Sequence, residues 1–260
     1  MKYNTEMSNS HLSYLKSSGT TWFNPCNGII MFWDEYRKVS LKYNISHQET
    51  WKHRDLKRAK EIFCASIVAK SIECQTKKGL WYIMKPKNDP PDAVVGTIVN
   101  DGKNDSMQVR EVEVVEIFGE NITELIVKKL TGKFYEPNTI LVCFLEPNES
   151  GPVNVEKVAK EIQNIETSLL NIFLVFPGMF IKNVSDLEKE LENKSEEERA
   201  RYFFKYTLVQ VKPIYTFETI DPIQACESWS KGEEINFYIH DNNKQHNKGP
   251  IHLENPPMLF

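Results

Sequence analysis

The chain has 260 residues, of which 40% are hydrophobic and 26% charged, an ordinary composition for a folded globular protein. Its five cysteines are scattered without a C-x-x-C pair, which argues against a disulfide framework or a zinc ribbon, and a net charge of −4 is unusual for a protein that contacts many phosphates. No apolar stretch reaches the ~20 residues of a membrane helix, and the first residues lack the apolar core of a signal peptide, so we expect a cytoplasmic protein with no membrane partner.

The N-terminal third is predicted to contain an arm and a long helix. Residues 1–45 mix polar and aromatic positions, and we expect a lid or arm packed on the core, with a short helix over Ile29–Lys42. The segment Ser46–Glu49 fits the S-x-x-E capping box, and about 28 residues without Pro or Gly follow. They predict one long helix with Glu61 at the edge of its apolar face. Its basic face would comprise Lys52, Arg54, Lys57, Arg58 and Lys60.

The middle of the chain predicts a mixed sheet. Three strand-like segments, a short amphipathic helix and a continuously apolar strand follow the long helix: Leu80–Lys85, Ala93–Val99, Val109–Ile117, Asn121–Leu130 and Thr139–Leu145. Asp101-Gly102 in the loop 100–107 is a hairpin turn signal. The order helix, three strands, helix, strand favours an α/β core over residues 46–150, with helices on the faces of a mixed sheet.

The remainder reads as an α+β extension of that core over residues 151–240. Val155–Leu170 predicts a helix, Asn171–Pro177 a buried strand, and Thr207–Phe217 a strand interrupted by Pro213. A second capping box at Ser185 opens a charged helical segment to about Phe204, and a short helix is expected over 223–230. Residues 241–260 read as a tail.

Acidic side chains inside the predicted strands are the main chemical signal. Glu111 and Glu113 alternate with valines and therefore share one face of a strand, and Asp92 stands at the start of the preceding strand. Carboxylates within strands cost desolvation free energy unless a partner offsets it. Three such groups at a sheet edge would suit Mg²⁺ or Mn²⁺. That ion could lower the pKa of a bound water and offset charge on a scissile phosphate.

The order of these elements over roughly 46–146 resembles the PD-(D/E)XK nuclease superfamily, which has a restriction-endonuclease-like αβββαβ core. The resemblance implies a Mg²⁺-dependent endonuclease that hydrolyses DNA phosphodiester bonds, for example in restriction or phage defence. Asp92 and Glu111 would bind the metal ion, and Glu61 would assist from the helix. Glu113 would stand where the family usually has lysine, and would act as a base or as a further ligand.

The missing lysine leaves alternatives open. Glu113 could itself be the metal-binding acid, which places Val115 at the lysine position and leaves a defective site. Lys85 or Lys128 could then supply a displaced cation.

A second hypothesis is a non-catalytic binding or regulatory module of the same fold. A third is an unrelated interaction protein, with Pro90-Pro91-Asp92 a rigid turn and the two glutamates surface residues. Under the nuclease hypothesis, the basic face of the long helix and Lys128–Lys129 would contact the DNA backbone. The extension would provide substrate selection or a homodimer surface.

Overall fold

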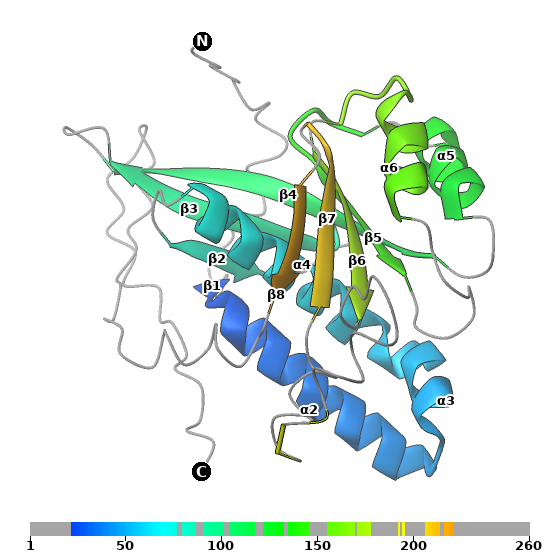
Figure 1. Ribbon diagram of the computed structural model, residues 1–260. Coiled ribbons are helices and arrows are strands. Elements are labelled where there is room, and N and C mark those ends of the chain that lie inside the picture. Colours follow the sequence, from blue (N-terminus) through cyan, green and yellow to red (C-terminus); the bar gives the residue numbers. More distant parts are fainter. Residues whose placement is uncertain are drawn as a thin grey trace.

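The computed structural model describes residues 22–76, 80–86, 91–100, 105–117, 122–132, 135–145, 155–169, 171–177, 192, 194–195, 206–213 and 216–220. They form an α/β fold in which a mixed sheet lies between two groups of helices (Figure 1). The helices are α2 (Pro25–Tyr43), α3 (His47–Lys52), the 3₁₀ turn η1 (Arg54–Leu56), α4 (Lys57–Thr76), α5 (Ile122–Gly132) and α6 (Val155–Gln163). The strands are β1 (Trp22–Phe23), β2 (Trp81–Met84), β3 (Ala93–Asn100), β4 (Asp105–Ile117), β5 (Ile140–Leu145), β6 (Asn171–Pro177), β7 (Tyr206–Lys212) and β8 (Thr216–Ile220).

The described strands form one eight-stranded sheet whose spatial order follows the chain from β1 to β8. Neighbouring strands are antiparallel from β1 through β4 and again from β6 through β8. The pairs β4–β5 and β5–β6 are parallel. Parallel neighbours need a crossover, and α5 and α6 supply the two that occur here. The expected order of helix, three strands, helix and strand is therefore observed as α4, β2, β3, β4, α5 and β5. The extension adds β6, β7 and β8 to the same sheet.

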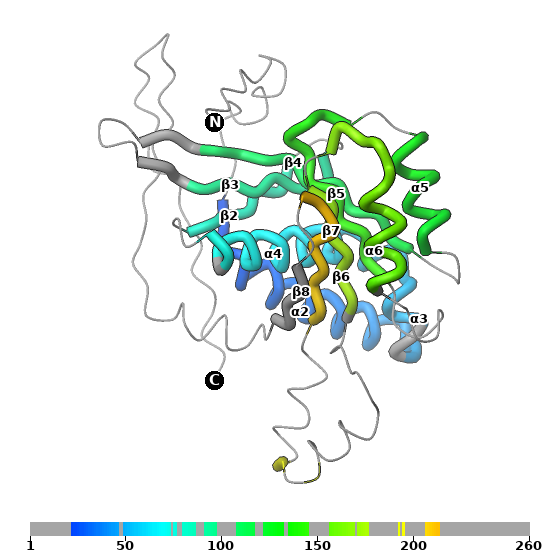
Figure 2. Tube along the Cα trace, turned by 45° about the horizontal axis from the view of Figure 1, so that its top comes forward, coloured from blue at the N-terminus to red at the C-terminus, as the bar shows by residue number. Residues whose placement is uncertain are grey.

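Two apolar cores define the layers. Helices α2, α3 and α4 cover one face of the sheet, here called the α4 face, and α5 and α6 cover the other, the α5 face (Figures 1 and 2). Along β4, Val112 belongs to the core under α4 and Ile117 to the core under α5. Because side chains alternate along a strand, this assignment fixes the face of each residue of β4 from Val109 to Ile117.

The N-terminal helix is longer than the sequence indicated and belongs to the packed body. It begins after Asn24, whose side chain accepts a hydrogen bond from the Cys26 N–H at 2.8 Å, and Pro25 occupies its first turn. It ends at Asn44, which has a left-handed φ of 49°. The helix packs against α4 closely enough that a Cβ added to Gly28 would lie 2.0 Å from Ser66 Oγ.

The expectation of one long helix from Ser46 was wrong, although its capping box is present. His53 has extended backbone angles, φ −69° and ψ 131°, and separates α3 from η1 and α4. Its Nδ1 accepts a hydrogen bond from the Asp55 N–H at 3.2 Å, which caps the new helical start. The break allows both Trp51 and Leu56 to be buried in the core on the α4 face.

Several boundaries also differ from the sequence expectation. Strand β4 begins at Asp105 instead of Val109, α6 ends at Gln163, and the segment around Pro213 forms two antiparallel strands, β7 and β8. The predicted helices over 185–204 and 223–230 and the tail 241–260 fall outside the described residues, apart from 192 and 194–195. Within the described part of the chain, no helix is long and apolar enough to cross a membrane.

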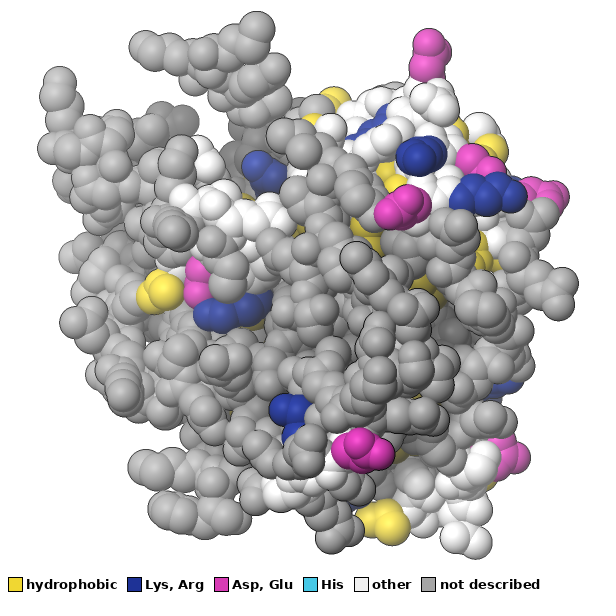
Figure 3. Space-filling model, in the orientation of Figure 1, with side chains coloured by type: hydrophobic (Ala, Val, Ile, Leu, Met, Phe, Trp, Pro, Cys, Tyr) yellow, Lys and Arg dark blue, Asp and Glu magenta, His cyan; other side chains and the backbone are white. Residues whose placement is uncertain are grey.

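The outer surface of α5 and α6 carries both charge signs. Lys128 and Lys129 are exposed on α5, as the nuclease hypothesis requires, but Glu124 is exposed on the same helix. On α6, Lys157 lies 4.0 Å from Glu161. Figure 3 shows positive and negative side chains interspersed over this region at its upper right. This mixture does not resemble a continuous basic surface for nucleic acid.

Candidate functional site

Asp92 lies where β3 begins and its carboxylate contacts β4. The last register pair of the β3–β4 hairpin is Ala93 with Val112, and one residue further on the Asp92 Oδ2 accepts a hydrogen bond from the Val114 N–H at 2.7 Å. Backbone N–H groups of a strand point along the sheet. The carboxylate therefore sits at the start of β3, between the two faces of the sheet, and is only 7% exposed.

The same register separates the two glutamates of β4. Glu111 pairs with the buried Val94, which lies two positions after Asp92 in β3. Glu113 directly precedes Val114, the residue that Asp92 contacts. Both glutamates lie on the α5 face, as their shared alternation predicted, but Glu113 is the one beside Asp92. The structure thus brings together Asp92 and Glu113, the pair in which Val115 occupies the position expected for lysine.

Tyr135 is a neighbour of this pair that the sequence analysis did not identify. Its ring is buried in the core on the α5 face, and burial raises the pKa of its hydroxyl to about 12, with smaller contributions from Glu113, Cys143 and Asp92. Its backbone carbonyl accepts a hydrogen bond from the Ser168 hydroxyl at 2.7 Å, which fixes the segment before β5. No periodic or motif signal marks an isolated tyrosine in a loop, so only the fold could identify it.

Glu61 approaches Asp92 from the α4 side. Burial raises the pKa of the Glu61 carboxyl above its model-compound range, and the negative charge of Asp92 adds to that effect, whereas Arg58 and Lys57 oppose it. Arg58 Nη1 lies 2.8 Å from Glu61 Oε2, and Lys57 Nζ lies 3.7 Å from Oε1. Glu61 is therefore coupled to Asp92 but lies on the opposite side of the sheet from Glu111 and Glu113.

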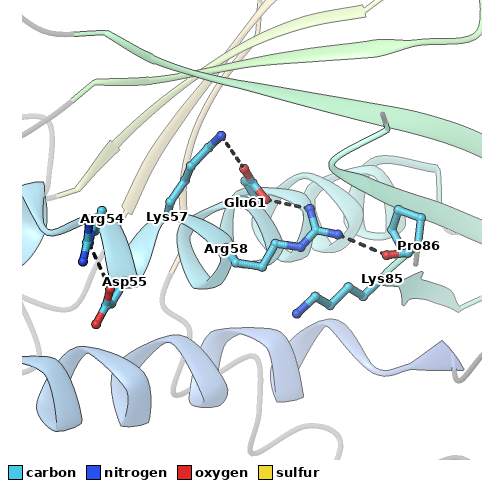
Figure 4. A pocket seen from close by; sticks show the side chains of 7 residues that line it. All are labelled: Arg54, Asp55, Lys57, Arg58, Glu61, Lys85 and Pro86. Carbon is cyan, nitrogen blue, oxygen red and sulfur yellow. Dashed lines mark hydrogen bonds and ion pairs between the residues drawn. The ribbon is translucent and has the colours of Figure 1, made fainter. Parts of the chain in front are cut away.

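A cationic cavity adjoins Glu61. This cavity of about 600 Å³, called the α4 pocket below, is lined by Arg54, Asp55, Lys57, Arg58, Glu61, Lys85 and Pro86. Figure 4 shows Lys85 extending from the end of β2 beneath Arg58 toward the start of α4. Arg58 is fixed in place because its Nη2 also donates to the Pro86 carbonyl at 3.2 Å. The basic face predicted for the long helix is present here through Arg54, Lys57 and Arg58.

Lys60, which was assigned to that basic face, is instead buried, and that assignment was wrong. Its Nζ donates to the Trp51 carbonyl at 2.8 Å and to Glu116 Oε2 at 2.5 Å, and the residue is 1% exposed. Glu116 faces α4 because it alternates with Val112 and Val114. The alternation of β4 could have placed Glu116 on the helix-covered face, but it could not have identified Lys60 as its partner.

Among the described residues, no group of three or more His, Cys, Asp or Glu side chains is arranged to hold a metal ion. Mg²⁺ is commonly held by one or two carboxylates, with water and substrate phosphates completing its shell. By the β3–β4 register Asp92 and Glu113 are the two carboxylates in neighbouring positions, and Glu61 and Glu111 lie outside the pair.

The chain matches no known protein-family model, and neither curated protein sequences nor solved structures include a significant match.

Proposed function

We propose that the protein is a divalent-metal-dependent endonuclease that hydrolyses DNA phosphodiester bonds, with α4, β2, β3, β4, α5 and β5 as a restriction-endonuclease-like core. One observation carries the proposal: the Asp92 carboxylate contacts β4 beside Glu113, at the end of the β3–β4 hairpin. The α4 pocket, with its arginine and lysine side chains, adjoins Glu61 on the other side of Asp92. Asp92 is thus the acidic group between Glu113, on the α5 face, and the cationic pocket, on the α4 face.

Each residue has a proposed role. Asp92 and Glu113 hold Mg²⁺ or Mn²⁺, an ion that acidifies a bound water and offsets phosphate charge when present. Glu61 orders the water structure on the α4 side of Asp92. Arg58 and Lys85 hold a phosphate of the nucleic acid in the α4 pocket. Glu111 is the acidic residue that this scheme leaves without a direct role.

A second candidate is a non-catalytic nucleic-acid-binding module of the same fold. It is favoured by Val115, which stands two residues after Glu113 where the resemblance leads us to expect lysine. Val115 is partly buried against the core on the α5 face and supplies no charge. In this candidate the α4 pocket still binds nucleic acid, while Asp92 serves to complete the hydrogen bonding of β4 through Val114.

A cleavage assay separates the two candidates. Plasmid and single-stranded DNA are incubated with Mg²⁺ or Mn²⁺ and with wild type, Asp92→Asn, Glu113→Gln, Glu111→Gln or Val115→Lys. The nuclease proposal expects wild type to cleave DNA. Asp92→Asn and Glu113→Gln should each reduce cleavage by more than about 100-fold, because losing a residue that only supports a metal ligand typically costs about 10- to 100-fold. Glu111→Gln is the matched control, because it makes the same change on the same face of β4 and should retain activity.

The other outcomes decide against the proposal in different ways. Cleavage by Val115→Lys alone would support the non-catalytic candidate and a site that lost its lysine. Equal losses in Glu111→Gln and Glu113→Gln would contradict the assignment of Glu113 as the ligand beside Asp92. If no variant cuts DNA and calorimetry detects no Mg²⁺ or Mn²⁺ binding, the carboxylates have a structural role and the nuclease proposal fails.

A further inference from the structure

The α4 pocket contains more positive than negative charge. Four cationic side chains and two carboxylates line it, a formal balance of +2. The two carboxylates are already close to cations of the same pocket: Asp55 lies 3.7 Å from Arg54 Nε, and Glu61 lies 2.8 Å from Arg58 Nη1. The α4 helix is twenty residues long and begins at Lys57, so the positive end of its dipole adds to the excess.

Among the described residues, Lys85 is the cation of the pocket for which no counter-ion is found. It is exposed at the end of β2, and within the described part of the chain it makes no hydrogen bond or ion pair. Its ammonium group is directed along the pocket beneath Arg58 (Figure 4). A lysine is a compact point charge with three donors, so it can contact an anion that the fixed Arg58 guanidinium also reaches.

The charge balance favours one chemical class of ligand. A phosphodiester carries a single negative charge, whereas a phosphate monoester carries about −1.5 to −2 at neutral pH and offers three acceptor oxygens. The monoester matches the excess of the pocket more closely. The cavity volume of about 600 Å³ also exceeds what one phosphate group occupies and leaves room for the attached nucleotide.

We infer that the α4 pocket binds a phosphate monoester at the end of a nucleic-acid strand, and that Lys85 provides the contact that distinguishes a terminal phosphate from a backbone phosphate. This inference rests on the proposed function, because it identifies which part of the nucleic acid the pocket binds. It implies that strand ends, including those produced by a cut, bind more tightly than uninterrupted strands. The chemistry is shared by free mononucleotides, so the test includes both sources.

Fluorescence anisotropy in EDTA measures the inference without any metal-dependent step. The full chain is titrated into internally labelled single-stranded oligonucleotides of one sequence, with a 5′-phosphate, a 3′-phosphate or no terminal phosphate. We expect at least one phosphorylated oligonucleotide to bind about tenfold more tightly than the unphosphorylated one, the effect of one charge-assisted hydrogen bond. Lys85→Gln should remove that preference. Lys157→Gln, an exposed lysine on α6, should retain it.

Each contrary result has a distinct meaning. Equal affinity for all three oligonucleotides overturns the inference and leaves the proposed function standing. A preference that survives Lys85→Gln overturns the role of this lysine and of the α4 pocket. If adenosine monophosphate competes as strongly as the phosphorylated oligonucleotide, the strand-end assignment is overturned. If no oligonucleotide binds at all, the proposed function fails together with the inference.

Discussion

Replacing Lys60 should destabilise the protein strongly, although a lysine on a helix surface would normally tolerate the change. Its Nζ is buried between the Trp51 carbonyl and the Glu116 carboxylate, at 2.8 Å and 2.5 Å. Removing one partner of a buried ion pair typically costs 3–5 kcal/mol of unfolding free energy. Because the Glu116 side chain keeps 21% exposure, we expect Lys60→Met to cost about 3 kcal/mol, near the lower end of that range.

The pair should behave as a unit. Glu116→Leu leaves a buried ammonium group and should also cost about 3 kcal/mol. The double variant Lys60→Met/Glu116→Leu removes both charges and leaves the Trp51 carbonyl without the Lys60 donor, which should cost about 1–2 kcal/mol. The two substitutions should therefore be strongly non-additive in a double-mutant cycle.

Thermal and urea unfolding followed by circular dichroism measure these changes. For a chain of this size, a loss of 3 kcal/mol lowers Tm by roughly 6–12 °C. Lys38→Met is the matched control, because Lys38 lies 2.6 Å from Glu35 but its side chain is 68% exposed. Because solvent screens that exposed pair, its loss should change stability very little. A Lys60→Met variant as stable as Lys38→Met, or a double variant that loses the sum of the single losses, would refute the reasoning.

Two further predictions concern the contact of α2 with α4 and the Glu61 carboxyl on α4. Gly28→Ala should lower Tm, because its Cβ would lie 2.0 Å from Ser66 Oγ and such overpacking costs about 1–3 kcal/mol, against a helix propensity gain of about 1 kcal/mol. Adding Ser66→Ala should largely restore Tm. A higher Tm for Gly28→Ala alone would contradict the close packing of α2 on α4. The raised pKa of Glu61 means that its neutral form is favoured in the fold, so its stabilising contribution is present below the unfolded pKa of 4.5 and is lost as the pH rises through the folded pKa. Urea titrations should therefore show that wild type loses stability relative to Glu61→Gln when the pH is raised from about 4 to about 7.5. A stability difference between the two proteins that does not change with pH would argue against a buried carboxyl.

Local sequence patterns determined most of the element order. Apolar runs located β5 and β6, the capping box located the start of α3, and the breaks at Gly and Pro separated the strands. The alternation along β4 placed Glu111 and Glu113 on a common face, and that prediction is confirmed. These features depend on neighbours within one element, so they are readable from the chain alone.

The composition of the candidate site was decided by tertiary structure. The register of β3 against β4 selected Glu113 as the neighbour of Asp92, and a shift of two residues would have selected Glu111 without changing which face either occupies. The sheet separates Glu61 from both glutamates, which no sequence spacing could indicate. Lys60 and Glu116 are 56 residues apart in the chain, and their contact exists only because α4 packs on β4. Periodicity fixes where a side chain points relative to its own element, whereas register and packing fix what it meets.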